Sequence, residues 1–168
     1  MNLDIDIEAP WPASTDWADL AERAAEAVAA AVPELDNERL TASVLFTSDE
    51  EVQVLNRQWR AKDKPTNVLS FPMIGRDDLL ALAPSGAPEM LGDLALASET
   101  CTREAAEKGV PIEDHATHLI VHGLLHLAGL DHETGEAEAE AMEALETRIL
   151  ASIGISDPYG DRTQGSRD

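Results

Sequence analysis

Three histidines lie within one eleven-residue stretch of this sequence, at spacings of four and six residues. They are His122, His126 and His132, and Gly129 stands between the last two. Because four residues make about one helical turn, His122 and His126 would project from the same face of a helix. Gly129 can adopt the left-handed conformation that ends a helix and reverses the chain, so we expect His132 to return towards the pair.

Three converging imidazoles fit an open zinc site. Catalytic zinc takes three protein ligands and keeps a fourth position for water or substrate, whereas structural zinc usually closes its shell with four side chains, often cysteines. Cys101 is the only cysteine. Neutral imidazoles keep the positive charge of the ion, which lowers the pKa of bound water towards ~7. The stretch therefore predicts a hydrolase with one zinc ion bound by His122, His126 and His132.

The other two histidines precede this stretch. His118 lies one turn before His122 and eight residues before His126. In a helix, eight residues correspond to a rise of about 12 Å. One ion with bonds of about 2.0–2.1 Å does not easily bind both. We therefore expect His118 to be packed or to lie in the outer shell of the site, and His115 to lie on the surface.

The histidine spacing also matches that of the metzincin proteases, H-E-x-x-H-x-x-G-x-x-H. The glutamate of that motif is the general base, and Gly123 stands in its place here. A zinc peptidase would therefore lack its main catalytic group, although Asp131, beside His132, is a possible substitute base. The peptidase is the least favoured alternative.

A second candidate site is the one basic cluster of an acidic chain. The formal net charge is −21, so the overall field should repel nucleic acid and anionic membranes. Within residues 57–64, however, Arg57, Arg60, Lys62 and Lys64 are opposed only by Asp63. The cluster can be a solvated helix end, because cationic side chains are favoured in the last turn of a helix. It can also be a contact site for an anion, and both interpretations stay open.

The remaining pattern predicts one α+β domain over residues 1–155 and a disordered tail over residues 156–168. Strands are expected over residues 2–8, 41–47, 66–72 and, less clearly because Leu and Ala also suit helices, 91–97. Helices are expected over residues 16–33, 49–60, 98–108, 112–128 and 136–153, with Trp17 in the core and Val52, Leu55 and Trp59 facing inward. Residues 75–90 form the longest turn-rich stretch and predict a mobile loop. The acidic run of the last helix predicts a solvated face.

Composition also limits the compartment and the partners. No apolar run approaches the ~20 residues of a membrane span, so no membrane partner is expected. The acidic, alternating N-terminus is unlike a secretory signal. The single Cys101 excludes an internal disulfide and fits a reducing cytoplasm, and we expect it to be a partly buried helix residue.

The sequence resembles the YbeY family, the bacterial endoribonucleases of ribosomal RNA maturation. The resemblance rests on three blocks over about residues 40–155. They are His-Gly-Leu-Leu-His-Leu-Ala-Gly-Leu-Asp-His at 122–132, Asn56-Arg57 to Asp63 followed by Pro65-Thr66-Asn67-Val68-Leu69-Ser70-Phe71-Pro72, and Leu91-Gly92-Asp93-Leu94. Two positions depart from the family pattern: Leu130 replaces a common tyrosine, and Asn67 stands where aspartate is frequent.

The resemblance implies a small four-stranded mixed sheet flanked by about five to six helices, with the histidine-bearing helix central. It implies zinc-dependent cleavage of single-stranded RNA, mainly at the 3′ end of small-subunit ribosomal RNA, and a role in ribosome quality control. Carried over by position, the metal ligands are His122, His126 and His132, and the family's functional arginine is Arg60. Its guanidinium suits the negative charge that develops on a phosphate during cleavage.

The family also implies a small-subunit ribosomal protein and an assembly GTPase as partners. Partners that assist RNA binding would suit a chain whose acidic surface offers RNA only one groove. The alternative from another class is a non-catalytic ribosome assembly factor whose metal site is structural.

Overall fold

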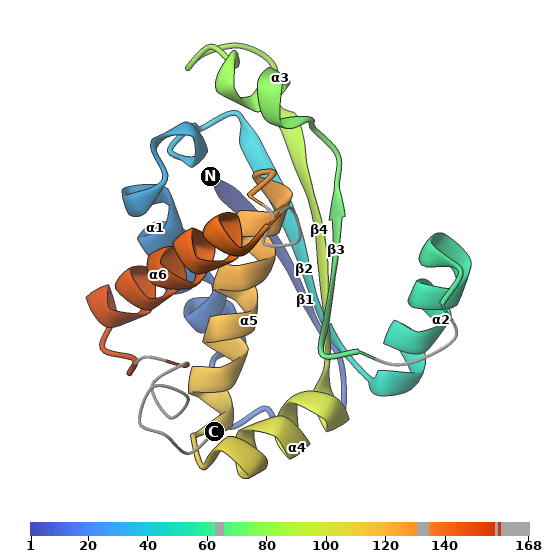
Figure 1. Cartoon of the computed structure of the whole chain (residues 1–168). Helices are drawn as coiled ribbons and strands as arrows, with labels where there is room; N and C mark the ends of the chain where they lie inside the picture. Colours follow the sequence, from blue (N-terminus) through green and yellow to red (C-terminus); the bar gives the residue numbers. More distant parts are fainter. Residues whose placement is uncertain (63–65, 131–134, 157, 159–168) are drawn as a thin grey trace.

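The computed structural model describes residues 1–62, 66–130, 135–156 and 158 (Figure 1). Its elements, in chain order, are β1 (Asn2–Ile7), α1 (Trp17–Ala31), the short 3-10 helix η1 (Pro33–Leu35), β2 (Leu40–Thr47), α2 (Asp49–Arg60), β3 (Val68–Pro72), α3 (Arg76–Leu80), β4 (Glu89–Ala97), α4 (Ser98–Lys108), α5 (Ile112–Leu127) and α6 (Glu136–Ser152). The predicted elements are present within a few residues of the expected bounds, and the ambiguous segment 91–97 is a strand.

The four strands form one mixed sheet in the order β1-β2-β4-β3. β1, β2 and β4 run parallel, and β3 pairs antiparallel with β4, with Ser70 opposite Leu94. β3 is therefore an edge strand, and one of its sides is open for other elements to approach. The predicted α+β fold with a small four-stranded mixed sheet is confirmed.

Helix α5 is central because it packs on the sheet and is covered in turn by other helices. Its apolar residues Ile120, Leu124 and Leu127 are completely buried in the main core. α6 packs against α5 on the side away from the sheet, and α1 packs beside α5 and also contacts β1 (Figure 1). The histidines on α5 are thus carried by the most firmly packed helix of the domain.

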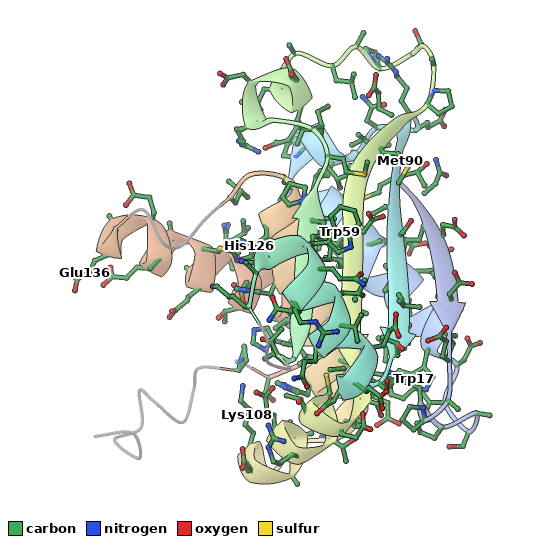
Figure 2. All side chains as sticks on the ribbon, turned by 90° about the vertical axis from the view of Figure 1, so that its right-hand side faces the viewer. Trp17, Trp59, Met90, Lys108, His126 and Glu136 are labelled. Carbon is green, nitrogen blue, oxygen red and sulfur yellow. The ribbon has the colours of Figure 1, made fainter. Side chains whose placement is uncertain are left out.

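Helix α2 covers part of the opposite face of the sheet (Figure 1). Its N-cap Ser48 accepts a hydrogen bond from the backbone N–H of Glu51, and the helix ends where Ala61 adopts the left-handed conformation (φ 57°). Val52 is buried against this face, but Trp59 is 72% exposed (Figure 2). The expectation that Trp59 faces inward is wrong, because the buried stripe of α2 is short and does not include its last turn.

The N-termini of α2 and α4 cap each other. The carboxylate of Asp49 accepts hydrogen bonds from the backbone N–H and the hydroxyl of Thr100, at 2.9 and 2.7 Å. In return, the Glu99 carboxylate accepts from the backbone N–H of Asp49 at 2.9 Å. Backbone N–H groups in the first turns of both helices gain partners, and the two helices are held in one relative orientation.

The expectation of a loop over residues 75–90 is wrong in part. Residues 76–80 form α3, and Glu89 and Met90 belong to β4. Leu79 is buried, and Arg76 donates a hydrogen bond to the backbone oxygen of Ala128 at 2.8 Å while it pairs with Glu34 at 2.6 Å. This segment therefore fastens the C-terminal end of α5 to the domain.

Two further expectations concern the ends of the chain and membranes. The predicted tail lies almost entirely outside the described residues, since only Ser156 and Pro158 of it are described. Across the described ranges, no helix has both the length and the apolar character needed to cross a membrane.

Candidate active site

A cleft of about 880 Å³ runs between α5 and the edge strand β3. It is open on one side, and α4 contributes to one end of it. The residues that line it are Arg60, Thr66, Asn67, Val68, Ser70, Phe71, Pro72, Glu104, Glu107, Lys108, His115, His118, Leu119, His122, Gly123 and His126. Of the four predicted site residues, His122, His126 and Arg60 thus lie in one cavity, and His132 lies outside the described residues.

The two described metal-ligand candidates face each other across one helical turn. The Nε2 atoms of His122 and His126 are 3.1 Å apart, and the ring centroids are 4.5 Å apart. Both rings are partly exposed to the cleft, whereas their neighbours on α5 are buried. The predicted convergence of this pair on one side of the helix is confirmed by the geometry.

The hydrogen on His122 is positioned by Glu146 of α6. The Nδ1 atom of His122 lies 2.9 Å from Oε1 of Glu146. Because an ionised carboxylate only accepts hydrogen bonds, Nδ1 must carry the hydrogen, and the neutral ring then has its lone pair on Nε2. That lone pair is directed to the cleft side, beside Nε2 of His126.

This arrangement fits half of a zinc shell. Two nitrogens bonded to one tetrahedral ion at about 2.0–2.1 Å would lie about 3.3 Å apart, close to the observed separation. A ligand histidine whose second nitrogen donates to a carboxylate is the usual supporting arrangement at zinc sites. Within the described residues no group of three or more His, Cys, Asp or Glu side chains is arranged to hold a metal ion, and His132, the third predicted ligand, is not among these residues.

The turn that should return His132 to the site is present up to Leu130. Gly129 has a φ of +86°, the backbone N–H of Gly129 bonds to the oxygen of His126, and that of Leu130 bonds to the oxygen of Leu125. These bonds end α5 in the manner expected for glycine after a helix. The predicted role of Gly129 is confirmed, and His132 as a ligand stays a prediction.

Glu146 also binds His118, so it links two histidines of α5. Its Oε2 atom lies 2.8 Å from Nε2 of His118, and its side chain is only 1% exposed. Burial raises the pKa of this carboxyl, but the hydrogen bonds from His118 and His122 outweigh burial and lower the pKa to about 2. Glu146 is therefore a carboxylate at neutral pH, and His118 is packed behind the site as expected.

Arg60 reaches the same cleft from α2, on the other side of the sheet edge. It is exposed, and within the described ranges no carboxylate pairs with it. Its guanidinium can therefore bind an anion in the cleft without first breaking an ion pair of that kind. A bidentate contact to phosphate is the chemistry for which this group is best suited.

His115 occupies the far end of the cleft, and its predicted surface position is wrong. It is only 3% exposed, and its Nε2 atom lies 2.8 Å from Oε1 of Glu104 on α4. Burial lowers the pKa of the His115 imidazole, and the bond to Glu104 only partly opposes this. The packing of α4 against α5 buries a position that the helical pattern alone leaves undetermined.

Gly123 lies where α5 passes over β4. A Cβ atom at this position would be 2.7 Å from Cδ2 of Leu94, which is itself buried. A glutamate here would have to displace the buried side chain of Leu94. The absence of the metzincin base thus follows from helix packing as well as from the sequence.

The domain is α+β, and its cleft contains an arginine and a histidine pair that a buried carboxylate supports. These features together define a hydrolase-type site suited to phosphate esters. The Endoribonuclease YbeY family model matches residues 7–154. The chain is 63% identical to Endoribonuclease YbeY of Novosphingobium aromaticivorans over 94% of its length and 95% of that protein. It is also 63% identical to the Erythrobacter litoralis relative of the same name over 97% of its length and 100% of that protein.

A solved structure agrees with the fold. The solution structure of TM1509 from Thermotoga maritima matches with a TM-score of 0.59 at 25% identity, covering 98% of this chain and 96% of that one. The chain belongs to the YbeY family, and the family predicted from the three sequence blocks is confirmed.

Proposed function

We propose that this chain is a zinc-dependent endoribonuclease that cleaves single-stranded RNA. The observation that carries the proposal is the single cleft shared by Arg60 and the His122–His126 pair, which approach the edge strand β3 from two different helices. Relatives that match nearly the whole chain are named Endoribonuclease YbeY. Together these support RNA as the substrate and phosphodiester cleavage as the reaction.

In this proposal the protein supplies positioning and charge. His122, His126 and His132 hold the ion, and Glu146 keeps the hydrogen of His122 on Nδ1. When bound, zinc supplies positive charge that polarises a phosphate oxygen or lowers the pKa of water towards ~7. Arg60 binds the non-bridging phosphate oxygens, on which negative charge develops as the bond breaks.

Two nucleophiles are compatible with this arrangement, water and the ribose 2′-hydroxyl adjacent to the cleaved bond. Attack by the 2′-hydroxyl leaves a 2′,3′-cyclic phosphate, whereas attack by water leaves a linear phosphate end. The chemical form of the product ends therefore distinguishes the two.

We further propose action in the cytoplasm at the 3′ end of small-subunit ribosomal RNA, in maturation and quality control. A net charge of −21 argues against tight binding of RNA by a broad surface. A small-subunit ribosomal protein and an assembly GTPase, the partners that the family resemblance implies, would bring the RNA to the cleft. A pull-down of both from a lysate by the intact chain, with and without ribonuclease treatment, tests these partners.

Cleavage of a single-stranded ribosomal RNA fragment by the purified, zinc-loaded protein tests the activity. Arg60→Ala should lower the rate by about 10²–10³-fold, the loss typical of one group that stabilises transition-state charge. His126→Ala should abolish both cleavage and stoichiometric zinc. Arg23→Ala is the matched control, since this exposed arginine of α1 pairs with Asp19 outside the cleft and should leave the rate unchanged.

Equal cleavage by wild type, Arg60→Ala and His126→Ala would mean that a contaminating nuclease is responsible. No cleavage by a zinc-loaded wild type that still binds ribosomal particles would favour the non-catalytic assembly factor. Zinc retained in full after replacement of His132 would remove that residue from the ligand set. Peptide hydrolysis that depends on His122 would revive the peptidase, against the packing of Gly123 on Leu94.

A further inference from the structure

The end of the cleft away from the histidine pair contains a second polar cluster that the proposed cleavage chemistry does not use. His115 and Glu104 line it together with Asn67, and Lys108 lies one turn beyond Glu104 on α4. His115 precedes His122 by seven residues of one helix, which corresponds to a rise of about 10 Å. The cluster is therefore too far away to act on the same phosphate as the histidine pair.

Glu104 is held in a defined orientation by two neutral donors. Its Oε1 atom accepts a hydrogen bond from Nδ2 of Asn67 at 3.0 Å and lies 2.8 Å from Nε2 of His115. Both bonds are made to the same oxygen. Among the residues that the structure describes, no hydrogen bond is made to Oε2, and the side chain is 28% exposed in the cleft. Glu104 thus presents one fixed acceptor to whatever enters.

The charge of Glu104 limits what it can bind. Burial raises the pKa of this carboxyl, but the hydrogen bonds from His115 and Asn67 outweigh burial and lower it, so the group is ionised at neutral pH. An ionised carboxylate accepts hydrogen bonds and repels phosphate. Lys108, which also lines the cleft, offers the opposite charge one helical turn away. This end can therefore pair a phosphate with Lys108 and an N–H donor with Glu104.

Single-stranded RNA supplies such donors on its base edges. Adenine, cytosine and guanine carry an exocyclic amino group, and a glutamate that accepts from the cytosine amino group is an established form of base recognition. Uracil has no amino group, and its one ring N–H is flanked by two carbonyl oxygens that a carboxylate repels. A fixed carboxylate oxygen should thus favour the three amino-bearing bases over uracil.

We propose that Glu104, oriented by Asn67 and His115, recognises one base of the RNA strand by accepting a hydrogen bond from its amino group. Stacked nucleotides rise about 3.4 Å each, so the recognised base lies about three nucleotides from the cleaved bond. The cleft would then have a cleavage end at His122 and His126 and a selection end at Glu104. This inference rests on the proposed ribonuclease function and adds a sequence preference to it.

The probes are fluorescent uridine hexamers in which a single nucleotide, at each position in turn, is replaced by adenosine, cytidine or guanosine. Binding to the zinc-loaded protein is measured by anisotropy, and cleavage is measured on the same hexamers. At one position, about three nucleotides from the cut, each amino-bearing base should strengthen binding roughly tenfold over uridine, the effect of one hydrogen bond to a charged group.

Glu104→Gln is the informative variant, because an amide both donates and accepts and so should accept uridine as well. Its preference at that position should fall to about twofold or less. Glu107→Gln is the matched control: it removes a carboxylate of the same helix that also lines the cleft but makes no hydrogen bond to Asn67 or His115, and its preference should equal that of wild type.

A merely structural role for Glu104 would lower binding and cleavage of all hexamers by the same factor and leave the base preference unchanged, which overturns the inference. Cleavage of every hexamer by the wild-type protein without a base preference also overturns the inference, and this result does not depend on whether the Glu104→Gln protein folds. It leaves the proposed ribonuclease function standing. Wild-type protein that neither binds nor cleaves any of them overturns both.

Discussion

The imidazole of His122 donates its Nδ1 hydrogen to the carboxylate of Glu146 over 2.9 Å, although the two residues are 24 positions apart in the chain. The same carboxylate holds His118 at 2.8 Å. One buried side chain of α6 therefore determines which nitrogen of His122 is available to a metal. The orientation of the candidate site depends on the docking of α6 against α5 as much as on α5 itself.

Replacement of Glu146 by glutamine should weaken zinc binding by about 10–100-fold, the usual effect of losing a carboxylate behind a ligand histidine. Glutamine keeps the size of the side chain, but it is neutral and can turn its amide N–H groups towards the histidines. Competition with a chromophoric chelator measures the affinity. Glu140→Gln, on an exposed position of α6, is the control and should bind zinc like wild type.

Unchanged zinc affinity in a folded Glu146→Gln protein would assign Glu146 to packing only. A loss of affinity equal to that of the Glu140→Gln control would point instead to the net charge of the helix. Circular dichroism of the zinc-free proteins shows whether the variant keeps its fold before metal is added.

The local pattern of the sequence was sufficient for most of the fold. α5 has strong helical spacing and Gly129 behind it, and both its extent and its end agree with prediction. β4 was ambiguous because Leu and Ala suit a helix as well. Its pairing with β2 on one side and β3 on the other, which no local pattern reveals, makes it a strand.

The supporting carboxylates of the site were missed because burial depends on which helices meet. α6 was expected to present a solvated acidic face, yet Glu146 is buried. One signal was available: Glu146 lies four residues after Met142 and three before Ile149, inside the apolar stripe of the helix. The sequence pattern predicts a surface position for His115 for the same reason, since only the approach of α4 covers it.

Cys101 should be unreactive in the folded protein. Burial in α4 raises the pKa of its thiol to about 12, helped by the nearby charges of Glu104 and Asp49. At pH 8 only about one molecule in ten thousand would then carry the reactive thiolate. Labelling with a thiol reagent such as Ellman's reagent should be slow in buffer and complete within minutes in denaturant. Rapid labelling of the native chain would contradict the buried position.

The pH dependence of stability should contain a contribution from His115. Burial lowers the pKa of this imidazole below its ordinary value of 6.5, so the folded state disfavours the proton. As the pH falls below about 6.5, the unfolded chain binds a proton that the folded chain does not, and the free energy of unfolding decreases. The contribution is fully present above that pH and is lost as the pH falls.

Urea unfolding at pH 7.5 and pH 5.5 measures this effect. His115→Gln should lose less stability between the two values than wild type, because glutamine takes up no proton. Glu104 faces His115 directly, so Glu104→Gln should increase the loss by removing the negative charge that partly restores the imidazole's pKa. An identical pH dependence for His115→Gln and wild type would contradict the prediction.

Asp49→Ala should lower the free energy of unfolding by about 1–2 kcal/mol, the typical effect of losing a helix cap. The backbone N–H and the hydroxyl of Thr100 both bond to this carboxylate, and both would lose their partner. Glu50→Ala is the control, because Glu50 is exposed in the same helical turn and should cost less than about 0.5 kcal/mol. Equal effects of the two substitutions would mean that the cap between α2 and α4 contributes nothing.

Gly92→Ala should be among the most destabilising single methyl additions in the chain. Gly92 has a φ of +154°, and a Cβ atom there would overlap the backbone oxygen of Phe71 and lie 2.7 Å from a methyl group of Leu127. The close approach joins β4 to the edge strand β3 and to the end of α5, and β3 and α5 are the walls of the cleft beside the histidine pair. Conformational strain and overpacking together should lower the free energy of unfolding by roughly 2–4 kcal/mol.

Gly109→Ala separates the two causes of that loss. Gly109 also has a positive φ, +70°, but nothing lies within 4 Å of a Cβ atom at that position. Its replacement should therefore cost only the backbone term, about 1 kcal/mol. If chemical denaturation gives the same loss for both variants, the clash with Phe71 is relieved by a shift of β3. The same shift would alter the cleft, so zinc affinity and RNA cleavage should then change in Gly92→Ala and not in Gly109→Ala.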